Sequence, residues 1–266
     1  SIDTISRSSF ERARFESIRD DMVRALRISV AKRPSSQVMD DLRESVLYGE
    51  WGEQAVIEAL EALTPAALRE YSEAFWASAS AEVLLYGNYE PESVEKISNM
   101  LTALIPDGEP VAMPPLKVLK LASGESLQYE VAVPHDDSVL AWYLQAAGNS
   151  WNDRAAAALT AQIMKSGFFQ QLRTEQQLGY VAATFAWAQL DVPGLVMLIQ
   201  SPVADAGGLE TAMDEFMQRV QGDLDQEQFE RHKAALVSDI LRPHKNIGER
   251  AAYYFRSIKR EQDDFA

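Results

Sequence analysis

Arg173 and Tyr180 are the residues of this sequence whose types and spacing best suit a binding site. The guanidinium of an arginine is a planar fork of donors that fits carbonyl and carboxylate oxygens. A tyrosine adds a flat apolar ring with one polar tip. Held on one surface, the two side chains could clamp an extended peptide. The plainer alternative, a surface arginine and a half-buried tyrosine without a ligand, stays open at this point.

The stretch that must position these two residues, 168–189, is predicted to begin as a short helix and to end as a strand. The helical spacing of its apolar residues breaks near Leu178. Gly179 is predicted to end the helix, because a residue just past a helix often takes a positive φ that only glycine adopts freely. From Tyr180 onward the residues favour a strand. Arg173 and Tyr180 are therefore expected on either side of a helix-to-strand corner.

The order of the expected elements after residue 116, strands first and then helices, predicts an α+β layer, in which an antiparallel or mixed sheet carries helices on one face. The strand at 195–199 is nearly all apolar and should be buried on both faces. In chain order, the expected elements are strands at 117–121, 127–133 and 139–146, a helix capped by Asn152 or Asp153 that runs to about residue 165, the strand from Tyr180, the strand at 195–199, and three helices, the first striped by Leu209, Met213, Phe216 and Val220.

The first hundred residues are predicted to be rich in helix, with a single short strand at 83–86. Since one strand cannot make a sheet, its partners are expected in the following segment or in a longer parent chain. Thr64 and Pro65 predict a helix start, with threonine as the cap and proline in the first turn. The expected helices are 8–31, with Phe15, Ile18, Met22, Leu26 and Val30 facing inward, then 36–47, 52–62, a helix after Thr64 that buries Leu68, Tyr71 and Phe75, and 91–104.

Composition excludes several classes of function. The 266 residues carry a net charge of −15, which argues against nucleic acid and against an anionic membrane surface as partners. The chain has no cysteine, so disulfides and thiolate metal sites are ruled out. The sequence opens at Ser1 without a methionine and ends directly after a helical pattern, so both ends are expected to be cut from something longer; trimmed ends or disordered tails would look the same.

No self-contained catalytic constellation is visible. The three histidines are His135, His232 and His244, and no two of them have the spacing that places a pair of ligands on one helix face. His135 lies in an acidic turn beside Asp136 and Asp137, where a metal site is conceivable but a solvated turn is the favoured interpretation.

Residues 169–181 read Phe-x-x-Leu-Arg-Thr-x-x-Gln-Leu-Gly-Tyr-Val, and Gln200 with Ser201 ends the apolar strand. This pattern resembles the C-terminal half of the M16 zinc metallopeptidases, in the branch of pitrilysin and insulin-degrading enzyme. Residues 85–89, Leu-Tyr-Gly-Asn-Tyr, are similar to a strand end in the third homologous domain of those enzymes. The resemblance covers nearly the whole chain, and the Arg-Thr-x-x-Gln-Leu-Gly-Tyr signature is its specific part.

The resemblance implies an M16 peptidase-like (LuxS/metallohydrolase-like) fold with four related α+β domains in two halves that close around a chamber. Residues 1–105 would be the later part of the third domain, 106–115 a Pro-rich linker, and 116–266 most of the fourth domain, truncated at its C-terminus. The family binds zinc on an inverted His-x-x-Glu-His helix in the N-terminal half. This sequence lacks that motif, so the chain is expected to bind no metal or other cofactor and to be inactive alone.

By the same resemblance, Arg173 and Tyr180 would bind the backbone of a peptide substrate near the zinc of the N-terminal catalytic half. The expected function is therefore the substrate-binding, non-catalytic part of a zinc-dependent metalloendopeptidase. Two alternatives remain open, a non-enzymatic assembly subunit of M16-like fold and a coenzyme-biosynthesis peptidase of the same superfamily. A bacterial periplasmic or cytoplasmic location fits the resemblance, and the lack of cysteine fits the periplasm.

Overall fold

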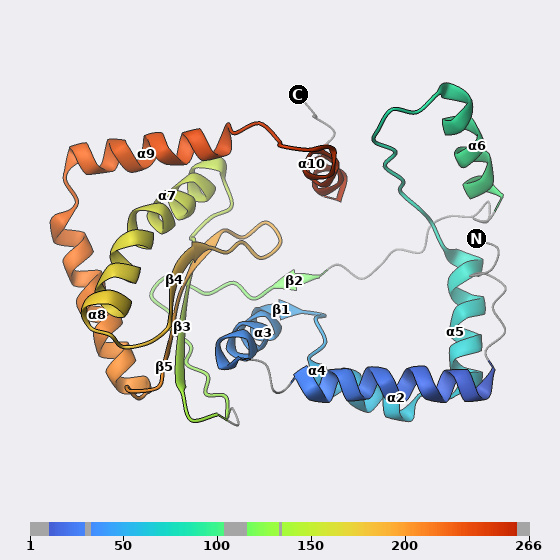
Figure 1. The fold of residues 1–266 in the computed structure, drawn as a ribbon, viewed down its shortest axis with the longest axis horizontal. Coiled ribbons are helices and arrows are strands. Elements are labelled where there is room, and N and C mark those ends of the chain that lie inside the picture. The colour runs from blue at the N-terminus through green and yellow to red at the C-terminus, as the bar shows by residue number, and fades with distance from the viewer. Residues whose placement is uncertain (1–10, 30–32, 104–115, 133–134, 260–266) are drawn as a thin grey trace. The chain divides into compact units, whose positions relative to one another are not determined.

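The computed structural model describes residues 11–29, 33–103, 116–132 and 135–259 (Figure 1). Its contacts define two compact units. One unit comprises Met22–Ala59 and Pro115–Leu241, and the other comprises Ser1–Asp21, Leu60–Pro114 and Arg242–Ala266. The linker predicted at 106–115 lies outside the described residues, and the predicted division into third and fourth domains stays a prediction.

A three-stranded antiparallel sheet forms the centre of the first unit. Strands β3 (Ser138–Gln145), β4 (Val181–Ala186) and β5 (Gly194–Ser201) are ordered β3-β5-β4. The register places Val139 and Val181 on either side of Gln200 in the central strand. This arrangement confirms the α+β prediction and, between its two alternatives, the antiparallel sheet.

One face of the sheet is packed against helices α7 (Trp151–Phe168) and α8 (Ala206–Asp223). Every residue of β5 is buried, as its apolar run predicts. Phe168 and Phe216 meet edge to face inside this core, with ring centroids 5.1 Å apart. The fully or almost fully buried residues that the two helices and β5 contribute include Met164, Phe168, Met197, Ile199, Leu209, Met213 and Phe216.

The opposite face is contacted by α3 (Pro34–Val46), so that α3 lies on one side of the strands and α7 and α8 lie on the other (Figure 1). Helix α3 leads into β1 (Leu47–Tyr48), which pairs with β2 (Lys117–Val118). Helix α9 (Gln226–Ile240) packs on α7. The prediction of helices on one face only is therefore wrong, because residues from the N-terminal quarter of the sequence cover the second face of the C-terminal sheet.

The remaining helices start where local signals place them. Thr64 caps α5, its side chain accepting a hydrogen bond from the backbone N–H of Ala67 at 3.2 Å, as predicted. For α7 the predicted cap is wrong: Ser150 is the N-cap, and Asp153 completes a capping box three residues later. The other bounds are α2 (Arg12–Ser29), α4 (Glu53–Ala62), α5 (Pro65–Ser78), α6 (Pro91–Thr102) and α10 (Ile247–Lys259). No described helix is long and apolar enough to cross a bilayer.

Several predictions made from pattern alone are wrong. Residues 83–86 and the described part of 127–133 form no strand, because strand-forming residues need a partner ladder and none of the described segments pairs with them. Tyr71 and Phe75 of α5 are 67% and 48% exposed rather than buried. In α2, Ile18 and Met22 are likewise about half exposed, while Phe15 and Val23 are buried. An apolar stripe is buried only where another element covers it.

Candidate substrate-binding site

The predicted corner is built on a π-helix, η1 (Phe169–Glu175), that continues directly from α7. Its wider turn is closed by a hydrogen bond from the N–H of Gln176 to the carbonyl of Gln171, at 2.9 Å. Gln171 and Leu172 are buried, and the Gln171 side chain accepts a hydrogen bond from Arg219 of α8. Segments of π-helix are frequent at functional sites, which agrees with the prediction of a binding site at this corner. The buried pair fixes η1 on the core while the next residue, Arg173, faces outward.

Arg173 is exposed, with its guanidinium over the ring of Phe169 at 4.9 Å from the ring centroid. This cation–π contact limits the directions in which the side chain can point. The guanidinium has no hydrogen-bond or ion-pair partner among the residues that the structure describes. Its donors therefore remain able to bind a carbonyl or carboxylate oxygen.

Gly179 serves a different purpose from the predicted one. The positive φ after the helix belongs to Gln177, at 53°, and Gly179 is not in the left-handed region. A Cβ added to Gly179 would lie 1.8 Å from the carbonyl oxygen of Gln200. Glycine is needed here because the backbone of the corner passes against the end of β5. Gln177 shows a conformation that costs a non-glycine residue free energy, which is typical of functional corners.

Tyr180 is 45% exposed, and its hydroxyl donates to Oδ2 of Asp137 at 2.9 Å. The amide of Gln200 donates from Nε2 to the same carboxylate oxygen at 2.7 Å and also contacts the Tyr180 hydroxyl. Gln200 is fully buried, and its Oε1 accepts a hydrogen bond from the backbone N–H of Ser35 at 3.1 Å. The tip of Tyr180 is therefore held by two residues while part of its ring stays open to solvent.

The contacts around the phenol also set the charges of the site. The hydrogen bond from Gln200 lowers the pKa of Asp137, helped by Tyr180 and His135 and opposed by burial. Burial, together with the hydrogen bond and the negative charge of Asp137, raises the pKa of Tyr180; Arg33 and Gln200 act in the opposite direction. At neutral pH the pair is thus a carboxylate that accepts and a phenol that keeps its proton.

Both residues singled out from the sequence lie at the exposed corner, and each is held by different neighbours. Sequence reasoning missed the roles of Asp137 and Ser35, and it noted Gln200 only as part of a motif. A signal for Gln200 was present, because it is a polar residue that ends an apolar strand, and a buried polar side chain must find partners. Nothing local in the sequence connects Ser35 with that strand.

Metal ligands do not gather around this corner. Among the described residues, no three histidine or acidic side chains lie where they could hold a metal ion together. The Nδ1 atom of His135 accepts a hydrogen bond from the backbone N–H of Asp137 at 3.0 Å, which uses one ring nitrogen for the turn itself. The described residues therefore do not fit a zinc site.

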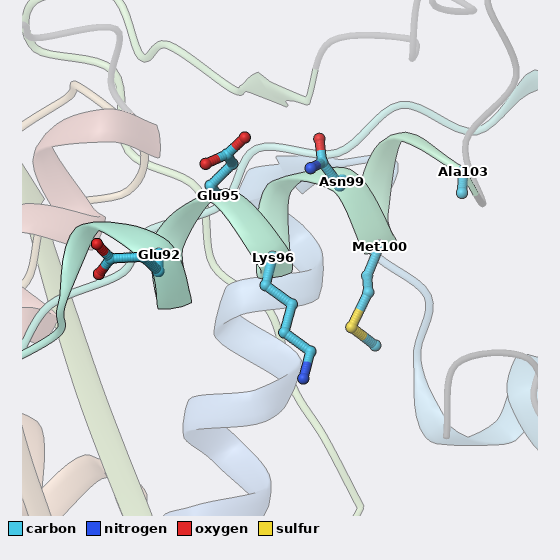
Figure 2. A pocket seen from close by; sticks show the side chains of 6 residues that line it. All are labelled: Glu92, Glu95, Lys96, Asn99, Met100 and Ala103. Carbon is cyan, nitrogen blue, oxygen red and sulfur yellow. The ribbon is translucent and has the colours of Figure 1, made fainter.

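A separate hollow lies beside α6 (Figure 2). Figure 2 shows Lys96 and Met100 pointing to one side of the helix and Glu95 and Asn99 to the other. The side chains that line it, with Glu92 and Ala103, all come from this one helix and its C-cap. Because the polar groups do not converge, the hollow has no set of contacts that would bind a ligand.

Comparison with known proteins gives matches over most of the chain. The family described as PQQ synthase PqqF-like, C-terminal lobe domain 4, matches residues 159–255. The A-factor-processing enzyme of Saccharomyces cerevisiae is 27% identical over 262 residues, covering 94% of this chain and 25% of that protein. The insulin-degrading enzyme of Drosophila melanogaster is 22% identical over 261 residues, covering 94% of this chain and 26% of that protein.

Among solved structures, the crystal structure of pitrilysin superposes with a TM-score of 0.82 at 20% identity, over 96% of this chain and 28% of that one. This likeness establishes a shared fold. The chain spans about a quarter of the length of the curated relatives it matches.

Proposed function

The chain belongs to the C-terminal part of the M16 peptidase family, with the α+β fold of that family, and on this premise we propose that it binds the substrate of a zinc-dependent metalloendopeptidase. In this proposal Arg173 and Tyr180 hold the backbone of an extended peptide. The zinc and the His-x-x-Glu-His helix are assigned to an N-terminal half that acts together with this chain. The chain itself contributes binding and orientation, and no metal ligand.

The observation that carries this proposal is the state of the Arg173 side chain. Its guanidinium is exposed, oriented by Phe169, and without a polar partner among the described residues. The two residues that precede Arg173, Gln171 and Leu172, are buried. The backbone at Arg173 is therefore held in place, and binding does not cost the free energy of ordering it. A guanidinium placed in this way can bind a peptide carbonyl, and it could stabilise the negative charge that such an oxygen develops during hydrolysis.

The domain assignment belongs to the same proposal. Residues 1–105 are assigned to the later part of the third family domain and residues 116–266 to most of the fourth. An arginine and a tyrosine supplied by one half would complete the site only when the two halves close, and closure would exclude water at that moment.

The first test uses the chain alone. An unstructured fluorogenic peptide is incubated with the 266-residue protein and added zinc, and cleavage is followed with and without a chelator. We expect no cleavage above background. Chelator-sensitive hydrolysis by the chain alone would show that it carries its own active site and would overturn the assignment.

The second test combines the chain with an N-terminal half that carries the inverted zinc motif, as one polypeptide or as two. Arg173→Ala should then lower kcat/KM by roughly 10²- to 10³-fold, which corresponds to about 2.7–4 kcal/mol of transition-state stabilisation, the range found for one oxyanion donor. Arg231→Ala, which removes an exposed arginine of α9, is the matched control and should leave kcat/KM unchanged. Normal kinetics in the Arg173 variant would remove this residue from the site.

One alternative is favoured by a particular finding. The family that matches residues 159–255 is described as PQQ synthase PqqF-like, which favours a coenzyme-biosynthesis peptidase as the second candidate. That candidate shares the binding chemistry and differs in substrate. Competition between an unrelated unstructured peptide and the peptide substrate of a coenzyme-biosynthesis pathway separates the two, since a dedicated biosynthetic enzyme would strongly prefer its own substrate.

A further inference from the structure

The end of β5 contains a buried amide that joins three segments of the chain. Gln200 is fully buried, and its side chain contacts Ser35 of α3, Asp137 before β3, and Tyr180 before β4. Ser35 and Gln200 are 165 positions apart in the sequence. The N-cap of α3, Arg33, makes no side-chain capping bond. Gln200 therefore satisfies one of the N–H groups that a helix leaves unpaired in its first turn.

The direction of every hydrogen bond in this cluster follows from the atoms involved. The backbone N–H of Ser35 can only donate, so it must face Oε1 of Gln200, and Nε2 must face the carboxylate. The carboxylate of Asp137 accepts from both Nε2 and the Tyr180 hydroxyl. The only hydrogen of the phenol is therefore directed to Asp137, while the contact between Nε2 and the hydroxyl places a donor against the phenol oxygen.

This arrangement determines what Tyr180 can offer a ligand. A hydroxyl has one donor and two lone pairs. Its donor is used by Asp137, one lone pair faces Nε2 of Gln200, and one lone pair is left. Because the pKa of Asp137 is lowered, its carboxylate stays ionised and continues to accept the hydrogen bond from the phenol.

We propose that Asp137 and Gln200 are positioning residues that hold Tyr180 as a hydrogen-bond acceptor, so that the site takes an extended peptide through a backbone N–H at Tyr180 and a backbone carbonyl at Arg173. This inference rests on the proposed function and adds which side chain accepts a hydrogen bond from the peptide and which donates one to it. An extended peptide presents both N–H and C=O groups along its length, so a single strand offers a donor to Tyr180 and an acceptor to Arg173.

The test is a double-mutant cycle on the zinc-dependent cleavage of the fluorogenic peptide by the chain combined with its N-terminal half. Tyr180→Phe keeps the ring and removes the acceptor, and Asp137→Ala releases the phenol. Each change should lower kcat/KM about tenfold, the size of one hydrogen bond. Because Asp137 acts through the hydroxyl, the double variant should be no worse than Tyr180→Phe alone.

Two further variants separate positioning from folding. Asp137→Asn retains an oxygen that can accept from Tyr180 and should recover most of the activity lost in Asp137→Ala. Asp136→Ala removes the neighbouring exposed carboxylate and should leave kcat/KM unchanged. Additive losses in the cycle, or failure of the asparagine to rescue activity at normal thermal stability, would overturn the positioning role.

The polarity is tested with peptides in which one backbone N–H at a time is replaced by an ester oxygen, at sites away from the scissile bond. Replacement of the N–H that binds Tyr180 should raise KM for the unmodified protein and leave KM of the Tyr180→Phe variant unchanged. If no ester shows this dependence on Tyr180, the acceptor assignment is wrong. Normal kinetics in both Arg173→Ala and Tyr180→Phe would instead remove the proposed function itself, so the two failures are distinguishable.

Discussion

Helix α5 and strand β5 show how differently two apolar segments of one chain can end up. Both are rich in apolar residues, and α5 has a well-formed N-cap at Thr64. Every residue of β5 is buried, whereas no residue of α5 is buried. The same contrast separates α8, whose Leu209, Met213 and Phe216 are buried, from α6, in which Met100 is 52% exposed. Capping residues and apolar periodicity determine where these elements begin. Their apolar residues become buried only where another element packs against them.

The largest expected difference in the free energy of unfolding is between alanine substitutions of a core phenylalanine and of an exposed one. Phe168→Ala removes a fully buried ring that packs on Phe216 and should lower the free energy of unfolding by about 3–5 kcal/mol. Phe75→Ala in α5, where the ring is 48% exposed, should cost about 1 kcal/mol or less. Urea unfolding of both variants, followed by circular dichroism, measures the difference. Equal costs would mean that α5 is covered as well as the sheet is.

Glycine substitutions give the next effect. Gly179→Ala places a Cβ against the carbonyl of Gln200 and should destabilise the protein by about 1–3 kcal/mol, as overpacking does. Gly222→Ala, in α8 with open space around the new Cβ, should instead stabilise it by about 0.5–1 kcal/mol. Thermal and urea denaturation of the two variants should therefore move in opposite directions; a neutral Gly179→Ala would contradict the close approach of the corner to β5.

Loss of the N-cap should destabilise α5 and α7 by similar amounts. Thr64 and Ser150 each accept a hydrogen bond from a backbone N–H in the first turn of their helix. Thr64→Ala and Ser150→Ala should each lower local stability by about 1 kcal/mol. Hydrogen exchange of the first amides of α5 and α7 measures this directly. A cost confined to α7 would show that capping depends on tertiary context and not on local geometry.

The smallest effects concern two carboxyl groups, Asp153 and Asp41, whose pKa values are shifted in opposite directions. Hydrogen bonds from Ser150 lower the pKa of Asp153, so its contribution to stability is present above the unfolded-state pKa and is lost as the pH falls through the folded-state value. Burial and nearby Glu44, Asp40 and Glu53 raise the pKa of Asp41, so its contribution is present below the unfolded-state pKa and is lost as the pH rises through the folded-state value. At pH 7, Asp153→Asn should destabilise and Asp41→Asn should stabilise the protein slightly. Unfolding of the two variants at pH 3 and pH 7 checks both signs.

The candidate site was predictable to the extent that its parts are local. Arg173 and Tyr180 belong to one short stretch, and the change from helical to strand spacing between them is visible in the residues. Asp137 could not be distinguished from the other acidic residues of its turn, because its role depends on a partner in another strand. Gly179 was identified correctly as a special position and explained wrongly, since the reason lies in the neighbouring backbone of Gln200.

By itself the sequence determined where most helices begin, that β5 would be buried on both faces, and which corner carries an arginine and a tyrosine. These features follow from the periodicity and capping preferences of neighbouring residues. Only the tertiary structure decided which apolar faces are covered, why Gly179 must be a glycine, and which residues hold the phenol of Tyr180. Burial and the hydrogen bonds of buried polar groups join segments as distant as α3 and β5, and no rule based on neighbouring residues contains that information.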